Sequence, residues 1–227
     1  ALADTFSDPK MARILTSIPQ ALPFDKRVKL FDSLLKADKA KTQDESVQML
    51  EVMLNMMRGE DGANSFRERV EIHRDNLYDD AMRQLNSLGP KLKKKIQVTF
   101  VSQHGTQEAG IDGGGVFKEF IDDLIKDAFQ PDTDSHEQLF SVTPLQTLTV
   151  SSDVTPNDVT TLSHYEFLGR VLGKAVYESI LVEPQFCLPF LNQLLGKVNS
   201  LEDLKNFDTE YYKNLTKLLT LSADQFD

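Results

Sequence analysis

Apolar residues recur at the spacing of an amphipathic helix through most of this chain, and no other feature limits its possible folds as strongly. The clearest example is VFKEFIDDLIKDAF, residues 116–129, in which apolar side chains return every three or four positions. Residues 154–165 are expected to form a loop before the next long helix. The same spacing predicts further helices at residues 24–39, 44–58, 75–89, 166–182, 186–197, 200–207 and 209–222.

Short stretches of strand-like alternation lie between these helices. Apolar residues alternate with polar ones near Val70 and Ile72, and again in IQVTFV, residues 96–101. Two more short strands are predicted within residues 139–153, where Pro144 separates them. Helix therefore dominates, and we predict a mainly α fold with a few short β strands, of the α+β class.

The loop GEDGANS, residues 59–65, is the strongest internal boundary, because glycine and small polar residues interrupt the periodic pattern there. We therefore divide the chain into a helical extension, 1–64, and a larger domain, 65–227. Methionines cluster in the extension at positions 49, 53, 56 and 57. They could line a pliable surface for a partner. A stripe of this kind more often faces a core, and we expect a core face here.

Composition excludes several classes of function. The chain has 227 residues, a formal net charge of −10 and a pI of about 4.9, and a field of that sign repels nucleic acids and anionic lipids. No apolar run approaches the roughly 20 residues that span a bilayer, and ALADTFSDPK lacks the pattern of a signal peptide. Cys187 is the only cysteine, which fits a reducing compartment. We expect a soluble protein of the cytoplasm, the nucleus or both, without nucleic-acid or membrane partners.

The segment GIDGGGVFKEF, residues 110–120, raises the question of phosphate binding, because glycine-rich turns before helices often cradle phosphates. A P-loop needs Lys-Ser/Thr after its last glycine, and a dinucleotide site needs Gly-x-Gly-x-x-Gly; this segment has neither. We infer that the glycines give the backbone freedom before a helix, and that two phenylalanines anchor that helix in the core. This structural signature consists of Gly113, Gly114, Gly115, Phe117, Glu119 and Phe120.

No residue pattern predicts a catalytic centre. Cys187 lies among Phe186, Leu188 and Phe190, an apolar setting that is typical of a buried structural cysteine, and nothing resembles a serine triad. The histidines form no metal-binding pair, and they are scattered at positions 73, 104, 136 and 164. We therefore expect no catalytic residue, no metal and no cofactor.

Several segments nevertheless follow one another in a specific order, from about Phe66 to the C-terminus. They read HRDNLYDDAMRQL, LKKKIQVTFV, EAGIDGGGVFKEFIDDLIKDAF, HYEFLGRVLGKAVYESILVE and SLEDLKNFDTEYYKNLTKLL. This order resembles the N-terminal lobe of a HECT-type ubiquitin ligase, and it is most similar to the ubiquitin ligase C branch and its fungal relatives. The resemblance implies that residues 65–227 are part of the large subdomain of such a lobe, preceded by a helical extension.

The resemblance also implies a ubiquitin-protein transferase. HECT ligases accept ubiquitin from a conjugating enzyme as a cysteine thioester and pass it to a substrate lysine, which divides one transfer into two steps. The family's catalytic cysteine lies in a C-terminal lobe, in a Thr-Cys-Phe-like motif that this sequence lacks, and Cys187 has the wrong context. We therefore expect a ligase fragment, truncated before its catalytic lobe and inactive alone. The alternative is a non-catalytic helical module that binds proteins.

Part of the family's binding site for the conjugating enzyme is expected in the last predicted helix. There the family forms the first wall of an apolar groove, and its positions match Tyr211, Leu215, Leu218 and Leu221. The spacing puts the first three on one helix face. These side chains could instead pack on the core, and the family more often has an aromatic residue at position 221. The small subdomain that completes the groove is expected after residue 227, so unpartnered helices could cause self-association.

Overall fold

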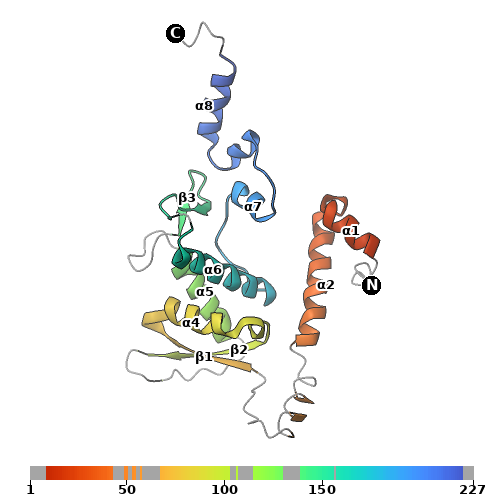
Figure 1. Cartoon of the computed structure of the whole chain (residues 1–227), viewed down its shortest axis with the longest axis vertical. Helices are drawn as coiled ribbons and strands as arrows, with labels where there is room; N and C mark the ends of the chain where they lie inside the picture. Colours follow the sequence, from red (N-terminus) through yellow and green to blue (C-terminus); the bar gives the residue numbers. More distant parts are fainter. Residues whose placement is uncertain are drawn as a thin grey trace. The chain divides into compact units, whose positions relative to one another are not determined.

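A computed structural model of the chain describes residues 9–42, 49–50, 53–54, 57, 67–102, 106, 115–129, 139–155 and 157–221 (Figure 1). Its many helices and few short strands confirm the predicted α+β class. The chain forms two compact units, which we describe separately. The first comprises Ala1–Asp75 and Arg83–Asp112, and the second comprises Asn76–Met82 and Gly113–Asp227. The boundary expected between residues 64 and 65 lies outside the described residues and stays a prediction.

The first unit contains a two-stranded parallel sheet. Strand β1, Arg67–His73, pairs with β2, Lys95–Val101, so that Ile72 lies beside Phe100. Both side chains are buried, in agreement with the predicted period of two. Parallel strands need a crossover connection. Here the connection consists of η3 (Arg74–Asn76), α4 (Leu77–Leu88), which contributes residues to both units, and η4 (Gly89–Lys93).

The N-terminal extension buries little of its predicted apolar stripe. In α2, Phe24–Thr42, Leu30 is the one buried residue, and Phe24 at its start is 73% exposed. An ion pair joins that helix to η4, with 3.0 Å between Lys93 Nζ and Asp38 Oδ2. The described elements of the extension are α1 (Pro9–Ser17), η2 (Pro19–Ala21) and α2 (Phe24–Thr42).

The methionine-rich segment does not form the expected core face. Met49, Met53 and Met57 have helical backbone and are 53%, 59% and 86% exposed, while Met56 lies outside the described residues. A helical stripe indicates which side chains share a face, but it does not specify what covers that face. The prediction of a core role is therefore wrong for these three residues.

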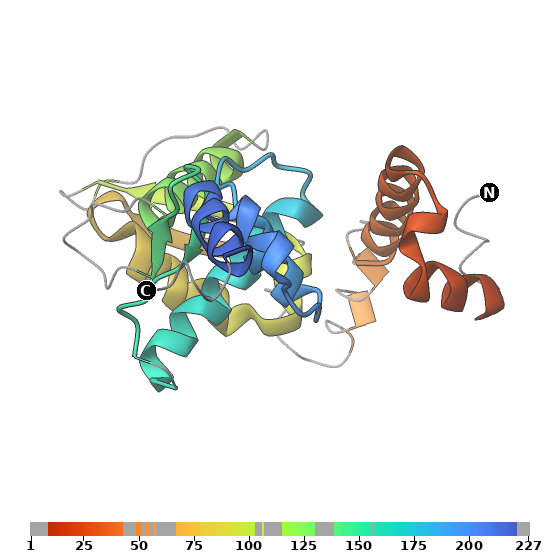
Figure 2. The ribbon, with the colours of Figure 1, turned by 90° about the horizontal axis from the view of Figure 1, so that it is seen from above.

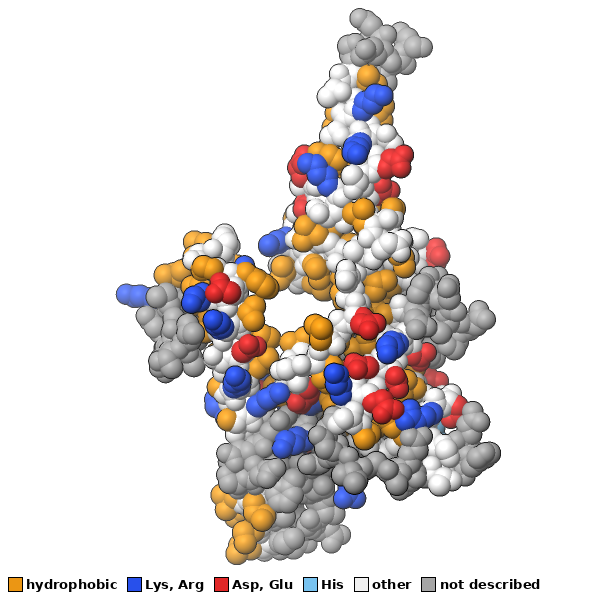
Figure 3. Space-filling view, turned by 180° about the vertical axis from the view of Figure 1, so that it is seen from behind, with side chains coloured by type: hydrophobic (Ala, Val, Ile, Leu, Met, Phe, Trp, Pro, Cys, Tyr) orange, Lys and Arg blue, Asp and Glu red, His pale blue; other side chains and the backbone are white. Residues whose placement is uncertain are grey.

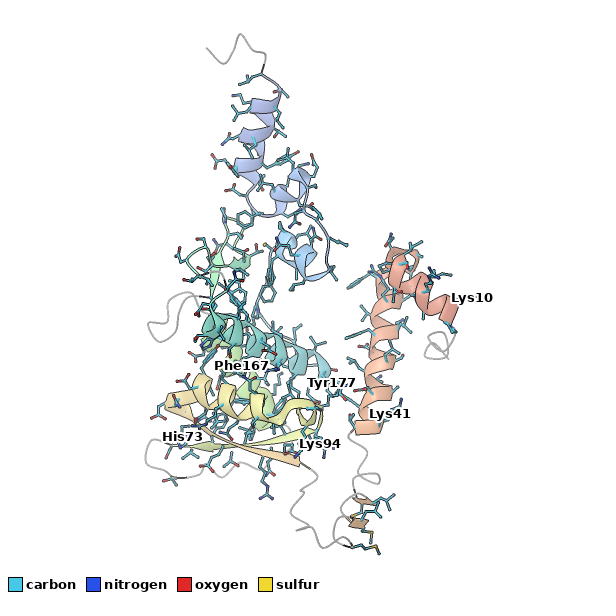
Figure 4. The ribbon with its side chains drawn as sticks, in the orientation of Figure 1. Lys10, Lys41, His73, Lys94, Phe167 and Tyr177 are labelled. Atoms are coloured by element: carbon cyan, nitrogen blue, oxygen red, sulfur yellow. The ribbon has the colours of Figure 1, made fainter. Side chains whose placement is uncertain are left out.

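Helices α5 (Gly115–Phe129) and α6 (Val159–Tyr177) pack together in the second unit. They contribute fully buried side chains such as Phe120 and Phe167, the latter labelled in Figure 4. These residues lie on the predicted apolar stripes. The apolar faces of the two helices therefore form much of the buried interior of this unit.

Helix α6 begins earlier than its apolar stripe predicts. Residues 159–165 are helical, whereas we expected a loop that continued to residue 165. The reason is an N-cap at Asp158, whose carboxylate accepts hydrogen bonds from the Thr161 N–H and the Thr161 hydroxyl, each at 2.8 Å. Such a cap satisfies backbone donors that otherwise lack partners at a helix start, so it extends the helix into a polar sequence.

The second unit also contains an antiparallel hairpin of β3 (Phe140–Val142) and β4 (Leu148–Val150), as predicted for the strands beside Pro144. The chain returns to this hairpin later: the Leu148 N–H donates to the Gln185 carbonyl at 2.7 Å, and the Cys187 N–H donates to the Leu148 carbonyl at 2.9 Å. Cys187 is 1% exposed, which confirms that it is a buried cysteine. These bonds fix the segment that leads into the C-terminal helices.

The last described elements are α7 (Leu188–Leu194), η5 (Leu201–Asn206) and α8 (Thr209–Leu219). Within the second unit, α8 lies at the end remote from α5 and α6 (Figure 1), and it therefore lies in front of other parts of this unit in the view from above (Figure 2). Among the helices that the structure describes, none is both long enough and apolar enough to cross a membrane.

Candidate protein-binding site

Helix α8 presents the apolar stripe that its spacing predicts. Its N-cap is Asp208, whose carboxylate accepts a hydrogen bond from the Tyr211 N–H at 2.8 Å. Tyr211, Leu215 and Leu218 then follow at positions i, i+4 and i+7, which share one helix face. Tyr211 is 54% exposed and Leu218 is 48% exposed, whereas Leu215 is half-buried. None of the residues 209–219 is buried, so this stripe lies at the surface of its unit.

The fourth expected groove residue, Leu221, lies just beyond α8. The helix ends at Leu219, and the Leu221 N–H still donates to the Leu218 carbonyl at 3.3 Å. The side chain of Leu221 is half-buried. The structure thus brings three of the expected residues onto one helix face and places the fourth at the end of that helix, outside its regular spacing.

Other exposed apolar residues of the C-terminal segment were not singled out by the sequence patterns. Leu219 is 73% exposed, and Leu194, Leu195 and Val198, at and after the end of α7, are 68%, 70% and 95% exposed. A signal existed for Leu194 and Leu195, because adjacent residues of a helix point in different directions and a single core cannot cover both. Figure 3 shows apolar side chains on the visible face of this C-terminal segment.

Three side chains join α8 to η5, and we call them the η5–α8 clasp: Glu202, Lys205 and Tyr212. The Tyr212 hydroxyl donates to Glu202 Oε1 at 2.8 Å, and Lys205 Nζ donates to the other carboxylate oxygen. The Lys205 ammonium also lies 4.6 Å from the centre of the Tyr212 ring, within the range of cation–π contacts. Each member contacts the other two, so the three groups form a closed network.

The contacts within the clasp shift the acidity of two of its members. The hydrogen bond from Lys205, and then that from Tyr212, lower the pKa of Glu202. The hydrogen bond to Glu202 raises the pKa of Lys205. Both charged groups are exposed to solvent, and exposed ion pairs contribute little to stability. We therefore expect the clasp to contribute little to the free energy of folding.

A second polar network joins η5 to α7. Asn192 Nδ2 of α7 donates to Asp203 Oδ1 of η5 at 3.4 Å and to Asn199 Oδ1, before η5, at 3.0 Å. Asn199 Nδ2 donates to the Pro189 carbonyl of α7 at 2.9 Å. At the start of η5, Asp203 accepts a hydrogen bond from the Ser200 N–H at 2.8 Å, which lowers the pKa of Asp203. Contacts therefore run from α7 through η5 to α8, and the side chains of α8 are at most half-buried.

Of the six signature residues, the structure describes Gly115, Phe117, Glu119 and Phe120, and all four lie at the start of α5. Phe117 and Phe120 are buried with ring centroids 6.2 Å apart, and Glu119 is exposed. Gly115 is the first residue of α5, while Gly113 and Gly114 lie outside the described residues. The two phenylalanines therefore hold the start of this helix in the interior.

A buried lysine of α6 was not predicted. Lys174 is 3% exposed, and its Nζ lies 2.6 Å from Glu178 Oε1 and 5.5 Å from the centre of the Phe117 ring. Lys174 lies three residues after Val171 and therefore on the apolar stripe of α6, so its spacing already indicated a position that faces inward. A charge in such a place needs a paired charge, and Glu178 supplies it.

The described residues do not form a metal centre, since no group of three or more His, Cys, Asp or Glu side chains among them could hold an ion. His164 instead contacts Tyr78, with 2.9 Å between His164 Nδ1 and the Tyr78 hydroxyl oxygen. Burial and, next, the negative charge of Asp79 raise the pKa of Tyr78, so its hydroxyl stays protonated at neutral pH. The contact links two elements of the second unit and has a structural role.

Comparison with protein families gives one match. Residues 122–227 match the family model described as HECT-domain (ubiquitin-transferase). The matched residues include most of α5 and all of the later elements, α6, α7, η5 and α8, together with the hairpin of β3 and β4.

Most of the chain is also similar to E3 ubiquitin ligases. It is 34% identical over 216 residues to E3 ubiquitin-protein ligase HUL5 of Saccharomyces cerevisiae, with 93% of the chain and 23% of that protein covered. It is 34% identical over 227 residues to human ubiquitin-protein ligase E3B, with 97% and 20% covered. Against E3 ubiquitin-protein ligase UPL6 of Arabidopsis thaliana it is 34% identical over 215 residues, with 94% and 19% covered. The chain spans about a fifth of the length of these curated relatives.

Proposed function

We propose that this chain contains part of a HECT domain, whose family model matches residues 122–227, and that it supplies part of the conjugating-enzyme-binding region of a HECT ubiquitin ligase. In this proposal the complete ligase accepts ubiquitin from the conjugating enzyme as a cysteine thioester and transfers it to lysines of protein substrates. The catalytic cysteine belongs to another part of the ligase, and the isolated chain is inactive.

The exposed stripe of α8 is the observation that carries this proposal. Tyr211 and Leu218 expose about half of their surface on one helix face, as an apolar groove wall must. An anchoring side chain of a partner gains most when a pocket encloses it and excludes water. Because α8 supplies one wall, we expect the isolated chain to bind a conjugating enzyme weakly and the complete ligase to bind it more tightly.

Finer assignments belong to the same proposal. The ubiquitin ligase C branch is supported by the motif order around GIDGGG, and the division into an extension at 1–64 and a partial lobe at 65–227 is supported by the loop between them. A location in the cytoplasm, the nucleus or both is supported by the single buried cysteine.

A binding measurement with a matched pair of variants tests the proposal. Leu218→Asp in the complete ligase should raise the Kd for a conjugating enzyme roughly tenfold or more, because it places a charge where an apolar anchor should dock. The control is Leu162→Asp, since Leu162 of α6 has similar exposure, 53% against 48%. Calorimetry would measure both constants. An unchanged Kd for Leu218→Asp, or an equal change in both variants, would contradict the proposal.

The alternative function, a non-catalytic helical module that binds proteins, is favoured by one observation. The exposed methionines Met49, Met53 and Met57 provide the adaptable apolar surface that promiscuous binders use. This alternative requires that the complete protein form no thioester with ubiquitin, so a charging assay separates it from the ligase proposal.

A further inference from the structure

We propose that the η5–α8 clasp is a positioning device that sets the direction of α8 for the conjugating enzyme; this inference rests on the function proposed above. The starting observation is that α8 has no buried residue and lies at the end of its unit. A helix whose side chains are at most half-buried is held less firmly by a core than a buried helix is. Side-chain contacts with the element beside it can therefore set its direction.

The clasp makes these contacts on a different side of α8 from the binding stripe. Successive residues of a helix turn by about 100°, so Tyr212 lies roughly a quarter turn from the face that Tyr211, Leu215 and Leu218 share. The Tyr212 hydroxyl donates to Glu202 at 2.8 Å. The clasp can thus hold α8 while the stripe remains open to a partner.

The clasp has a continuous connection to the interior. The Thr209 hydroxyl donates to the Lys205 carbonyl at 3.1 Å, which adds a bond between α8 and η5 at the start of the helix. From η5, the contacts continue through Asn192 and Asn199 to α7, and the buried Cys187, bonded to the hairpin, is the N-cap of α7. A change in the clasp therefore alters the direction of α8 and leaves the elements nearer the interior in place.

Two variants of the clasp separate its hydrogen bond from its cation–π contact. Tyr212→Phe keeps the ring beneath Lys205 and removes the hydrogen bond to Glu202, whereas Lys205→Arg keeps both a cation over the ring and a donor to the carboxylate. The control is Tyr165→Phe in α6, which removes a part-buried hydrogen bond from the tyrosine hydroxyl to the Leu139 carbonyl, at 2.5 Å. Tyr165 has no part in the proposed site.

The experiment measures ubiquitin transfer from a ubiquitin-loaded conjugating enzyme to the complete ligase. Tyr212→Phe should raise KM for the loaded enzyme roughly three- to fivefold, as expected for an exposed polar contact, with kcat unchanged. Lys205→Arg should keep the natural KM, and Tyr165→Phe should lower Tm without raising KM.

The other outcomes distinguish failure of this inference from failure of the proposed function. If Leu218→Ala raises KM and Tyr212→Phe does not, the clasp has no positioning role and this inference fails while the proposed function stands. If Leu218→Ala also leaves KM unchanged, the proposed function fails and the inference fails with it. If Tyr165→Phe raises KM as much as Tyr212→Phe does, loss of stability explains both effects and the inference is overturned.

Discussion

Lys174 is buried, although lysine is almost never fully buried without a partner. Its side chain is 2% exposed and that of Glu178 is 20% exposed. The ammonium also lies 5.5 Å from the centres of the Phe117 and Tyr177 rings. The ion pair therefore lies where α5 and α6 meet, and removal of one charge should cost more than removal of both.

Glu178→Ala should lower the free energy of unfolding by about 3 kcal/mol, because it removes the carboxylate that faces a buried ammonium. The double variant Lys174→Met/Glu178→Ala should lose clearly less, since an apolar side chain of similar length then lies between the rings. Urea unfolding followed by circular dichroism measures both values. Equal losses in the single and double variants would show that the pair contributes nothing.

At the scale of elements, the start of α6 depends on one cap. The Asp158 carboxylate accepts two hydrogen bonds from Thr161, and the bond from the Thr161 N–H is the main reason that the pKa of Asp158 lies below its ordinary value of 3.8. A pKa that is lower in the folded state adds stability above the pKa of the unfolded state. That stability is lost as the pH falls through the folded-state pKa.

Asp158→Ala should therefore destabilise the protein most at pH 6 and progressively less as the pH falls below about 4, where the unfolded chain begins to bind a proton at this carboxyl before the folded chain does. Asp158→Asn keeps an oxygen acceptor and does not titrate, so its stability should vary less with pH than that of the natural protein in this range. Urea unfolding at a series of pH values measures the differences. A pH-independent effect of Asp158→Ala would contradict the role assigned to the carboxylate.

The elements also show what sequence could and could not predict. The stripes of α5 and α8 followed from spacing alone, because each helix face is set within one segment. The cap at Asp158 was missed because it begins α6 within a polar stretch, before the apolar pattern starts. The core role of Met53 was wrong because spacing does not specify a covering partner. The clasp could not be predicted, since the contact of Glu202 with Tyr212 depends on the turn between η5 and α8.

At the scale of the whole molecule, the C-terminal helices carry more exposed apolar surface than their predicted site requires. Leu195 is 70% exposed and Val198 is 95% exposed, although neither belongs to the stripe of α8. Apolar patches on soluble proteins commonly mark interaction surfaces. Leu195 and Val198 are therefore expected to contact another protein surface.

The isolated chain should therefore self-associate in a concentration-dependent way, and Leu195→Asp should reduce this association by placing a charge in the patch. Light scattering after size-exclusion chromatography measures the mass. Val159→Asp is the control, since Val159 is 80% exposed at the start of α6, outside the patch. A monomeric natural chain at high concentration would refute the expectation.

The most direct test of the account is a charging assay with ubiquitin and a conjugating enzyme, read on non-reducing gels. We predict that the complete ligase forms a ubiquitin adduct that a thiol reductant removes. The isolated chain of residues 1–227 should form no such adduct, because Cys187 is buried and structural. A reducible ubiquitin adduct on the isolated chain that disappears in Cys187→Ser would contradict this prediction.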